Sequence, residues 1–188
     1  MTFETALSDE TLAVRAADGD EQAYTALVGR HKEVLYRVAR RYVGNADDAY
    51  DIVQQSFIAA WGGLDRYDPR RSFAAWLRSI TLNKCRDHAR RMAVRRFLMI
   101  PVAASAVENV ADPQPGAEEQ LIARKELADL DSAIARLPRS LKEPLLLNVF
   151  AGLSQAEAGR ELGISAKAVE TRVYRARQAL AEAIGKID

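Results

Sequence analysis

The side chains best placed for chemistry lie near the C-terminal end, on a predicted helix that begins after Ser165. Its apolar residues recur every three or four positions and therefore share one buried face: Val169, Val173, Ala176, Leu180 and Ile184. At about 100° per residue, the opposite face carries cations, a hydroxyl and a phenol, which suit base edges and phosphates in the major groove of DNA. The candidate DNA contacts on this face and its flanks are Lys167, Glu170, Thr171, Arg172, Tyr174, Arg175 and Arg177.

A shorter predicted helix comes just before this one and would hold it in place. Ser154 and Glu157 form a capping box at its start, in which each side chain satisfies a backbone amide that the new helix leaves unpaired. Gly163 can take the left-handed conformation that ends a helix, and Ser165 can cap the next one. This order of helix, turn and helix is the helix-turn-helix pattern. A solvated, salt-bridged helix pair is the alternative, but the caps, the turn and the polarity of the face all favour DNA binding.

A second group of candidate residues lies on a predicted helix from Ser72 to about Arg95, whose core stripe includes Phe73 and Leu77. An aromatic residue, an amide and several cations follow one edge of this helix. Such side chains can stack on a base, hydrogen-bond to its edge and hold the backbone of single-stranded nucleic acid. The alternative is a basic surface helix whose tryptophan belongs to the core. The candidate residues are Trp76, Ser79, Asn83, Arg86, Arg90 and Arg91.

Length and composition limit the remaining possibilities. The chain has 188 residues and a net charge of +1, so nucleic-acid binding must come from local basic patches. Its single cysteine excludes an internal disulfide. The acidic N-terminus does not resemble a signal peptide, and no run approaches the roughly 20 apolar residues that cross a bilayer. We therefore expect a cytoplasmic protein without membrane insertion.

The chain offers no recognisable catalytic or cofactor motif. It contains no glycine-rich phosphate loop and no metal-ligand spacing, and its two histidines, His31 and His88, fall on different predicted helices. The acids Asp47, Asp48 and Asp51 are better explained by helix capping and by a binding face than by a metal site. We expect no cofactor, no metal site, no catalytic residue and no enzymatic activity.

Helical periodicity dominates the whole chain, which predicts an all-α fold of two small helical domains joined by a flexible linker. The first domain spans residues 9–96 and the second residues 118–185. Three prolines and a glycine break the periodicity in the predicted linker, residues 97–117. Within the first domain, the predicted helix over 46–61 buries six residues: Ala49, Ile52, Val53, Phe57, Ala60 and Trp61. Its opposite, polar face is expected to show Asp47, Asp51, Gln54, Gln55 and Ser56.

These segments resemble a known family. DIVQQSFIAAW, followed by a polar loop and SFAAWLRSITLNKCRDHARR, resembles region 2 of bacterial sigma factors. LPRSLKEPLLLNVFAGLSQAEAGRELGISAKAVETRVYRARQAL resembles their region 4. Because only these two regions and a short linker are present, the chain is similar to sigma factors of the extracytoplasmic function (ECF) type, over about residues 10–184.

The resemblance implies a function and assigns roles to the candidate residues. Such proteins bind core RNA polymerase, through the coiled coil of its beta-prime subunit and the beta flap, and direct it to promoter DNA. The region 2 helix implied to dock on the coiled coil carries Asp51, Gln54, Gln55, Phe57 and Trp61. The edge that starts at Trp76 would read an unpaired base of the −10 element, and the helix-turn-helix would read the −35 element. An anti-sigma factor is the expected regulator.

The chain departs from the family pattern at a few positions. Glu170 replaces a common basic residue, Gln55 a frequent acid, and Ala158, Gly159 and Glu161 stand where larger or more apolar residues are usual. Two alternatives to an active sigma factor follow: a decoy that binds an anti-sigma factor without touching DNA, and an ordinary helix-turn-helix repressor. The retained basic residues disfavour the decoy, and the edge that starts at Trp76 would be unexplained in a repressor.

Overall fold

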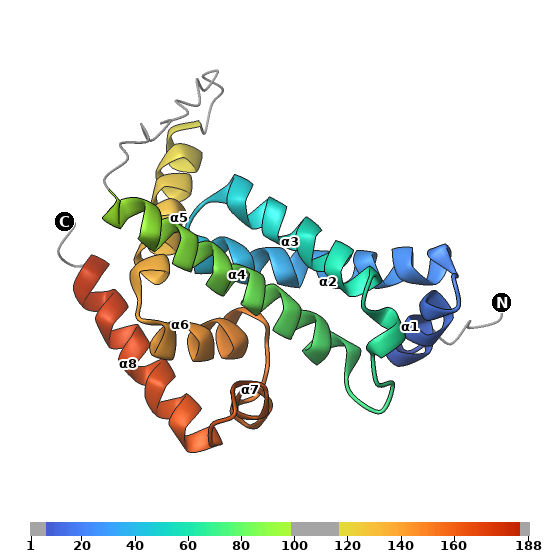
Figure 1. Ribbon diagram of the computed structural model, residues 1–188. Coiled ribbons are helices and arrows are strands. Elements are labelled where there is room, and N and C mark those ends of the chain that lie inside the picture. Colours follow the sequence, from blue (N-terminus) through green and yellow to red (C-terminus); the bar gives the residue numbers. More distant parts are fainter. Residues whose placement is uncertain (1–6, 99–116, 185–188) are drawn as a thin grey trace.

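The computed structural model describes residues 7–98 and 117–184, which form helices and turns without any strand (Figure 1). The N-terminal half comprises α1 (Asp9–Ala17), α2 (Glu21–Val43), α3 (Ala46–Trp61), the 3₁₀ turn η1 (Leu64–Arg66) and α4 (Phe73–Phe97). The C-terminal half comprises α5 (Ala117–Arg136), α6 (Arg139–Leu145), the π-helical turn η2 (Leu146–Phe150), α7 (Gln155–Leu162) and α8 (Ala166–Ile184). The predicted all-α fold is confirmed. Most of the predicted linker lies outside the described residues, apart from Phe97, which ends α4, Leu98, which follows it, and Ala117, which begins α5.

Side-chain caps define where the helices of the N-terminal half begin. The Asp20 carboxylate accepts a hydrogen bond from the Ala23 amide at the start of α2, with an N to O distance of 3.0 Å. At the start of α3 the Asn45 side-chain oxygen accepts one from the Asp48 amide, also at 3.0 Å. Gly44 separates these two helices with a φ of +79°, a left-handed conformation that costs glycine little. Local signals of this kind can be read directly from the sequence, because each capping side chain lies three positions before the amide that it satisfies.

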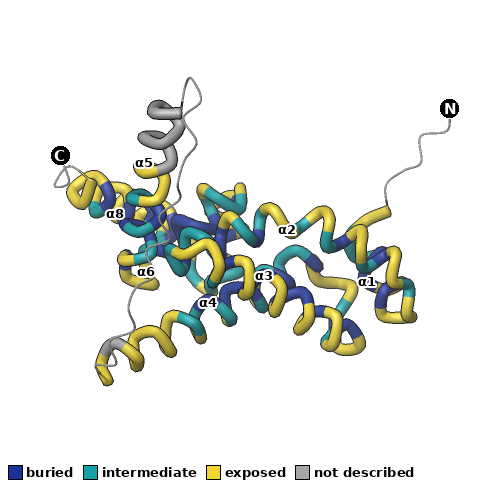
Figure 2. The backbone as a smooth tube through the Cα atoms, turned by 90° about the horizontal axis from the view of Figure 1, so that it is seen from above, coloured by how far each residue is buried: buried dark blue, intermediate teal, exposed yellow. Residues whose placement is uncertain are grey.

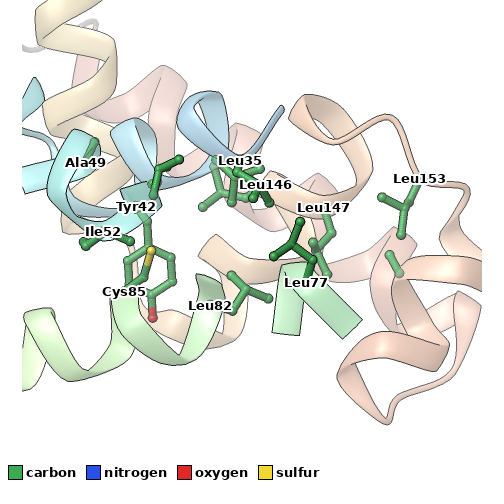
Figure 3. Close-up of a cluster of buried hydrophobic side chains, with 14 of the residues drawn as sticks. Leu35, Tyr42, Ala49, Ile52, Leu77, Leu82, Cys85, Leu146, Leu147 and Leu153 are labelled. Atoms are coloured by element: carbon green, nitrogen blue, oxygen red, sulfur yellow. The ribbon is translucent and has the colours of Figure 1, made fainter. Parts of the chain in front are cut away.

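The two halves are packed against each other around a shared core. Leu35 of α2 and Leu77 of α4 lie with Leu146 and Leu147 of η2 in one cluster of buried apolar side chains (Figure 3). Figure 2 shows that burial is concentrated where α2, α4 and α6 come together, whereas the far end of α4 is exposed. α2 also contacts α5. In this arrangement α5–α8 lie alongside one end of α2 and α4, instead of standing apart.

Two predictions of burial in the N-terminal half were wrong. Ser56, expected on the polar face of α3, is fully buried, and its hydroxyl donates to the Ile52 carbonyl at 2.7 Å, which satisfies the buried polar group. Trp61, expected in the core, is 41% exposed because it is the last residue of α3 and lies against Tyr24 at the rim, with ring centroids 4.7 Å apart. In the C-terminal half, Val149 is exposed because η2 turns it away from the leucines that fill the core.

Glycine at position 159 is explained by a close approach between α7 and the turn that follows it. A Cβ added to Gly159 would lie 2.7 Å from the Ile164 carbonyl oxygen, a distance that real Cβ atoms essentially never show. That contact belongs to backbone atoms, so no side-chain rotation can relieve it. The Ile164 amide also donates to the Gly159 carbonyl at 2.9 Å, which fixes the turn against the helix. The unusual small residue therefore sets the spacing inside the helix-turn-helix.

We predict that Gly159→Ala destabilises the protein by about 1–3 kcal/mol, the usual cost of overpacking a tight site. Gly29→Ala is the matched control, since Gly29 is an exposed glycine inside α2 with open space around its Cβ position. The control should be neutral or should stabilise by up to about 1 kcal/mol. Urea denaturation followed by far-UV circular dichroism measures both. Equal stability of the two variants would contradict the close approach at Gly159.

Candidate nucleic-acid interface

The helix-turn-helix is built as the sequence predicts. The Ser154 hydroxyl accepts from the Glu157 amide at 3.2 Å, and the Glu157 carboxylate accepts from the Ser154 amide at 2.8 Å, which completes the capping box. Gly163 ends α7 with a φ of +68°. The Ser165 hydroxyl then accepts from the Ala168 amide at 3.1 Å and caps α8. These three contacts fix the angle at which α8 leaves the turn.

α8 has one buried and one exposed face, as its periodicity predicts. Val169, Val173, Ala176 and Leu180 are buried, but Ile184 is 41% exposed because it is the last residue of the helix and the buried stripe ends at Leu180. The opposite face is open to solvent. The exposed candidate residues are Lys167, Glu170, Thr171, Tyr174, Arg175 and Arg177.

The exposed face of α8 is ordered by contacts among its own side chains. The Lys167 ammonium lies 2.9 Å from the Glu170 carboxylate, and Gln178 donates to the Tyr174 hydroxyl at 2.9 Å. Most of the face lines a shallow hollow of 470 Å³, which Asn148 and Gln155 also border. The face can therefore donate to and accept from a base edge. Its cation at position 167 is partly neutralised by its own neighbour.

Arg172 differs from the other candidate residues of α8. It is half-buried and lines a second hollow, of 540 Å³, that also contains Arg139 of α6 and Arg86 of α4. In this arrangement the Arg172 side chain is turned toward the N-terminal half and away from the exposed face. The structure thus separates Arg172 from the other predicted −35 contacts.

The α4 edge begins in an aromatic cluster. The half-buried Trp76 ring lies against Tyr67 and Phe73, with ring centroids 5.1 Å and 5.6 Å away. The exposed Ser79 hydroxyl donates to the Trp76 carbonyl at 2.6 Å. One side of the tryptophan therefore supports the core while the other reaches a hollow at the surface, which Ser79 also lines. The two sequence-based alternatives for Trp76, core residue and binding residue, are both compatible with this position.

Further along α4, polar and basic side chains are tied to one another. The exposed Asn83 amide oxygen accepts from Arg86 at 2.7 Å, and Arg90 forms an ion pair with Asp87 one turn earlier. Arg91 is exposed. Residues 76, 79, 83, 86 and 90 recur at helical spacing, so the structure brings these five onto one edge of α4.

The exposed face of α3 offers a further binding surface. Asp51, Gln54 and Gln55 are exposed as predicted, and Trp61 joins them at the rim. Phe57 is only 8% exposed and packs edge-on against Tyr24, so the prediction that it lines a docking surface needs correction. Its ring supports α3 from within, because its position on the helix faces the core.

Two exposed apolar residues of this face were missed by the sequence analysis. Tyr50 is 60% exposed and Ile58 is 71% exposed. Together with Gln54 and Trp61 they recur at spacings of four and three on the outer side of α3, a signal that was available in the sequence. Large apolar side chains on an exposed, partly acidic face are typical of a protein-binding surface.

Other kinds of site receive no support from the described residues. Within 7–98 and 117–184, no three histidine, cysteine, aspartate or glutamate side chains come together in a way that could hold a metal ion. Among the helices of the same ranges, none combines the length and apolar character needed to span a bilayer.

Comparison with known proteins identifies the class to which this arrangement belongs. Residues 27–95 match the sigma-70 region 2 family, and residues 127–180 match the sigma-70 region 4 family. The first match contains α3 and the α4 edge, and the second contains the helix-turn-helix. The chain therefore combines the two modules that define a sigma-70 type transcription initiation factor.

Whole-length relatives narrow this assignment. The chain is 43% identical to the RNA polymerase sigma factor CnrH of Cupriavidus metallidurans over 176 residues, which cover 92% of each protein. It is 35% identical to the ECF RNA polymerase sigma factor SigE of Mycolicibacterium smegmatis, over 93% of this chain and 67% of that protein. The solved structure of CnrH in complex with the cytosolic domain of CnrY covers 96% of this chain and 99% of its own, with a TM-score of 0.71 and 36% identity. The chain belongs to the sigma-70 family as an ECF RNA polymerase sigma factor.

We predict that Glu170→Ala strengthens binding to duplex DNA at low salt, because it releases the Lys167 ammonium from its ion pair to meet a phosphate. One added phosphate contact should steepen the dependence of log K on log salt concentration by about 0.9. Fluorescence anisotropy across a salt series measures this slope. Glu182→Ala, at an exposed position of the same helix, is the control for lost negative charge. Weaker binding to selected sequences alone would instead indicate that Glu170 accepts from cytosine N4.

Proposed function

We propose that this chain binds core RNA polymerase and directs it to its own set of promoters, where it reads the −35 element and helps to open the −10 element. Two separate faces suited to nucleic acid, one on α8 and one on α4, are the observation that supports this proposal. The α8 face suits duplex DNA, and the α4 edge suits an unpaired strand. We assign residues 9–96 to the region 2 domain, 97–117 to the linker and 118–185 to the region 4 domain.

For the −35 element, α8 would enter the major groove of the duplex. Its first exposed residues, Lys167 and Thr171, would reach base edges or phosphates near the N-terminal end of the helix. Tyr174, Arg175 and Arg177 lie further along and would hold the backbone on either side. A recognition helix of this kind needs a rigid angle to its partner helix, and the capped turn between α7 and α8 supplies it.

For the −10 element, the α4 edge would receive a base that has left the stack. Extruding one base costs a few kcal/mol, and stacking on an aromatic side chain can offset roughly 1–3 kcal/mol of that cost. Trp76 offers the stacking surface, and the exposed Asn83 amide can hydrogen-bond to a base edge. Arg86, Arg90 and Arg91 would hold the backbone of the same strand. The chain would thus act by binding, without catalysing a reaction itself.

The polymerase-binding surface is assigned to the outer side of α3, with region 4 meeting the beta flap. Asp51, Gln54 and Gln55 supply polar contacts for the beta-prime coiled coil, and Trp61 supplies an amphipathic rim. To this set we add Ile58, whose side chain is 71% exposed in the middle of the same face. The buried centre of a protein contact is more apolar than its rim, and an exposed aliphatic residue surrounded by polar ones fits that arrangement.

A regulatory partner is part of the proposal. The similar protein CnrH has been solved with the cytosolic domain of CnrY bound to it. We expect this chain, in the cytoplasm, to be held inactive by an anti-sigma factor that covers its polymerase-binding surface.

We predict that the double variant Trp76→Ala, Asn83→Ala binds core polymerase but loses promoter opening, because it removes the stacking surface and the amide. Run-off transcription with purified core polymerase on a genomic promoter library should give start sites with a shared −35/−10 pattern for the wild type. Transcription from these start sites should be at least tenfold lower with the variant, which corresponds to a loss of about 1.4 kcal/mol in binding free energy.

A template with a pre-opened −10 bubble separates the possible causes. If the variant fails only at opening the DNA, the bubble should restore most of the lost transcription. Because Trp76 also packs in an aromatic cluster, circular dichroism and Asn83→Ala alone check that the loss is not due to misfolding. Normal transcription by the folded double variant would refute the −10 assignment.

We predict that Ile58→Asp weakens binding to core polymerase by at least tenfold while leaving the fold intact, since substitutions at exposed positions rarely destabilise. A charge introduced in the centre of a contact surface must be desolvated there. Val14→Asp is the matched control, because Val14 is a 42% exposed aliphatic residue on α1. Competition for core polymerase in gel filtration measures the effect. Equal binding by both variants would place the polymerase contact elsewhere.

A further inference from the structure

The α4 edge assigned to the −10 element is in contact with the C-terminal half of the same chain. The Arg86 guanidinium meets the Glu143 carboxylate of α6 with two hydrogen bonds, Nε to Oε1 and Nη2 to Oε2, each of 2.8 Å. Two turns earlier, the Arg78 Nε lies 3.0 Å and 3.2 Å from the two oxygens of Glu161 on α7. Arg78 and Arg86 of α4 are therefore each bound by an acid from the other half.

Glu143 is held as a charged group inside this contact. Its side chain is only 5% exposed, and it also accepts from the Arg139 guanidinium at 2.8 Å and from the Tyr42 hydroxyl at 3.2 Å. Burial alone would raise the pKa of the Glu143 carboxyl, but the hydrogen bond and charge of Arg86, with help from Arg139 and Tyr42, bring that pKa below its ordinary value. The carboxylate thus stays ionised at neutral pH and neutralises Arg86.

The geometry of the Arg86 contact matches the way in which arginine binds a phosphate. A guanidinium presents two parallel N–H groups that fit the oxygens of a carboxylate or of a phosphate equally well. Glu143 fills both positions, so Arg86 has these donors available for a DNA backbone only when Glu143 has moved away. Asn83, next to it, also uses its amide oxygen for Arg86 in this arrangement.

The other end of the same edge is covered as well. Trp76 and Ser79 of α4 line a hollow of 560 Å³ whose opposite wall is formed by Glu157, Arg160 and Glu161 of α7. A strand of DNA that followed α4 from Trp76 to Arg86 would have to pass through this space. Helix α7 therefore competes with such a strand near Trp76 and Ser79, and α6 competes with it at Arg86.

Charged side chains make up a large part of the contact between the halves. Ion pairs cross it at three places: Arg86 with Glu143, Arg78 with Glu161, and Asp131 of α5 with Arg40 and Arg41 of α2, the last at 3.6 Å. In the Asp131 group, buried atoms of both arginines and of the aspartate lack hydrogen-bond partners. Water would satisfy all of them once the halves part, which offsets part of the cost of exposing the apolar side chains that the halves share.

We propose that Glu143 and Glu161 are internal substitutes for promoter phosphates, and that they keep the chain closed and unable to bind the −10 strand until Arg86 and Arg78 are released. This inference rests on the proposed role of the α4 edge in DNA binding. A polyanion is then both a ligand and a trigger: it competes with the two acids, and its binding opens the chain. Replacing either glutamate by an uncharged residue should open the chain in the same way as adding the polyanion.

The chain contains its own reporter of this opening. Cys85, the single cysteine of the sequence, is fully buried on α4 beside Tyr42, in the core that the two halves share (Figure 3). Burial raises the pKa of its thiol to about 12, with Lys142 and Glu143 of α6 among its charged neighbours. Burial and the raised pKa both suppress the reaction of Cys85 with a maleimide, and because α6 lies beside Cys85, parting of α6 from α4 should raise the labelling rate.

The test compares Glu143→Gln and Glu161→Gln with Glu182→Gln, which removes an exposed carboxylate from α8. We expect Cys85 to be labelled about ten times faster, or more, in the first two variants and at the wild-type rate in the third. Glu143 is the more deeply buried of the two acids, so Glu143→Gln alone would not distinguish opening from a disturbed α6. Glu161→Gln removes the less buried acid and therefore serves as an independent test of opening. Far-UV circular dichroism and small-angle X-ray scattering identify opening, in which helical content is kept and the radius of gyration grows.

A second arm uses a mixed-sequence single-stranded oligonucleotide as the phosphate probe. It should accelerate Cys85 labelling in the wild type, and it should bind Glu143→Gln at least several-fold more tightly than wild type or Glu182→Gln. Unchanged labelling in both acid variants overturns the proposal, as does faster labelling without tighter oligonucleotide binding. Neither result bears on whether Trp76 and Asn83 are needed for transcription, so failure here is distinct from failure of the −10 assignment.

Discussion

A buried carboxylate organises the contact between the two halves of this protein. Glu143 is 5% exposed on its side chain, and a charge in that position is tolerable only with several fixed partners. Arg86, Arg139 and Tyr42 supply those partners from α4, α6 and α2. Their geometry determines how α6 approaches α4, and the leucines of η2 fill the remaining space. Removing this one charge would leave three groups without a counterpart in the same place.

Helix α4 both packs in the core of the N-terminal half and exposes basic residues to solvent. Its first turns bury Phe73 and Leu77 completely, so this part is fixed in the core of the N-terminal half. Its last turns carry basic residues and are exposed. The edge between these parts is where single-stranded DNA is proposed to bind, and it is also where α6 and α7 make contact. One surface therefore takes part in both closure and DNA binding, which couples the two by mutual exclusion.

The sequence was sufficient for features that depend on neighbouring residues. The capping box of α7, the left-handed Gly163 and the cap at Ser165 all follow from chemistry within a few positions. Side-chain direction near helix ends was harder, because Trp61 and Ile184 sit where the periodic stripe runs out of packing partners. The pairing of Arg86 with Glu143 could not be predicted at all. These residues are 57 positions apart, and only the packing of the two halves brings them together.

The departures from the family pattern gain a physical explanation from this packing. Gly159 leaves room for the Ile164 carbonyl at a point where a Cβ would lie 2.7 Å away, and Ala158 is fully buried beside it. Glu161, on the same short helix, forms its ion pair with Arg78 of α4. All three lie on α7, while the exposed residues that would read duplex DNA lie on α8. Substitutions on α7 can therefore tune the contact between the halves without altering the recognition surface, so closure and promoter choice can vary independently.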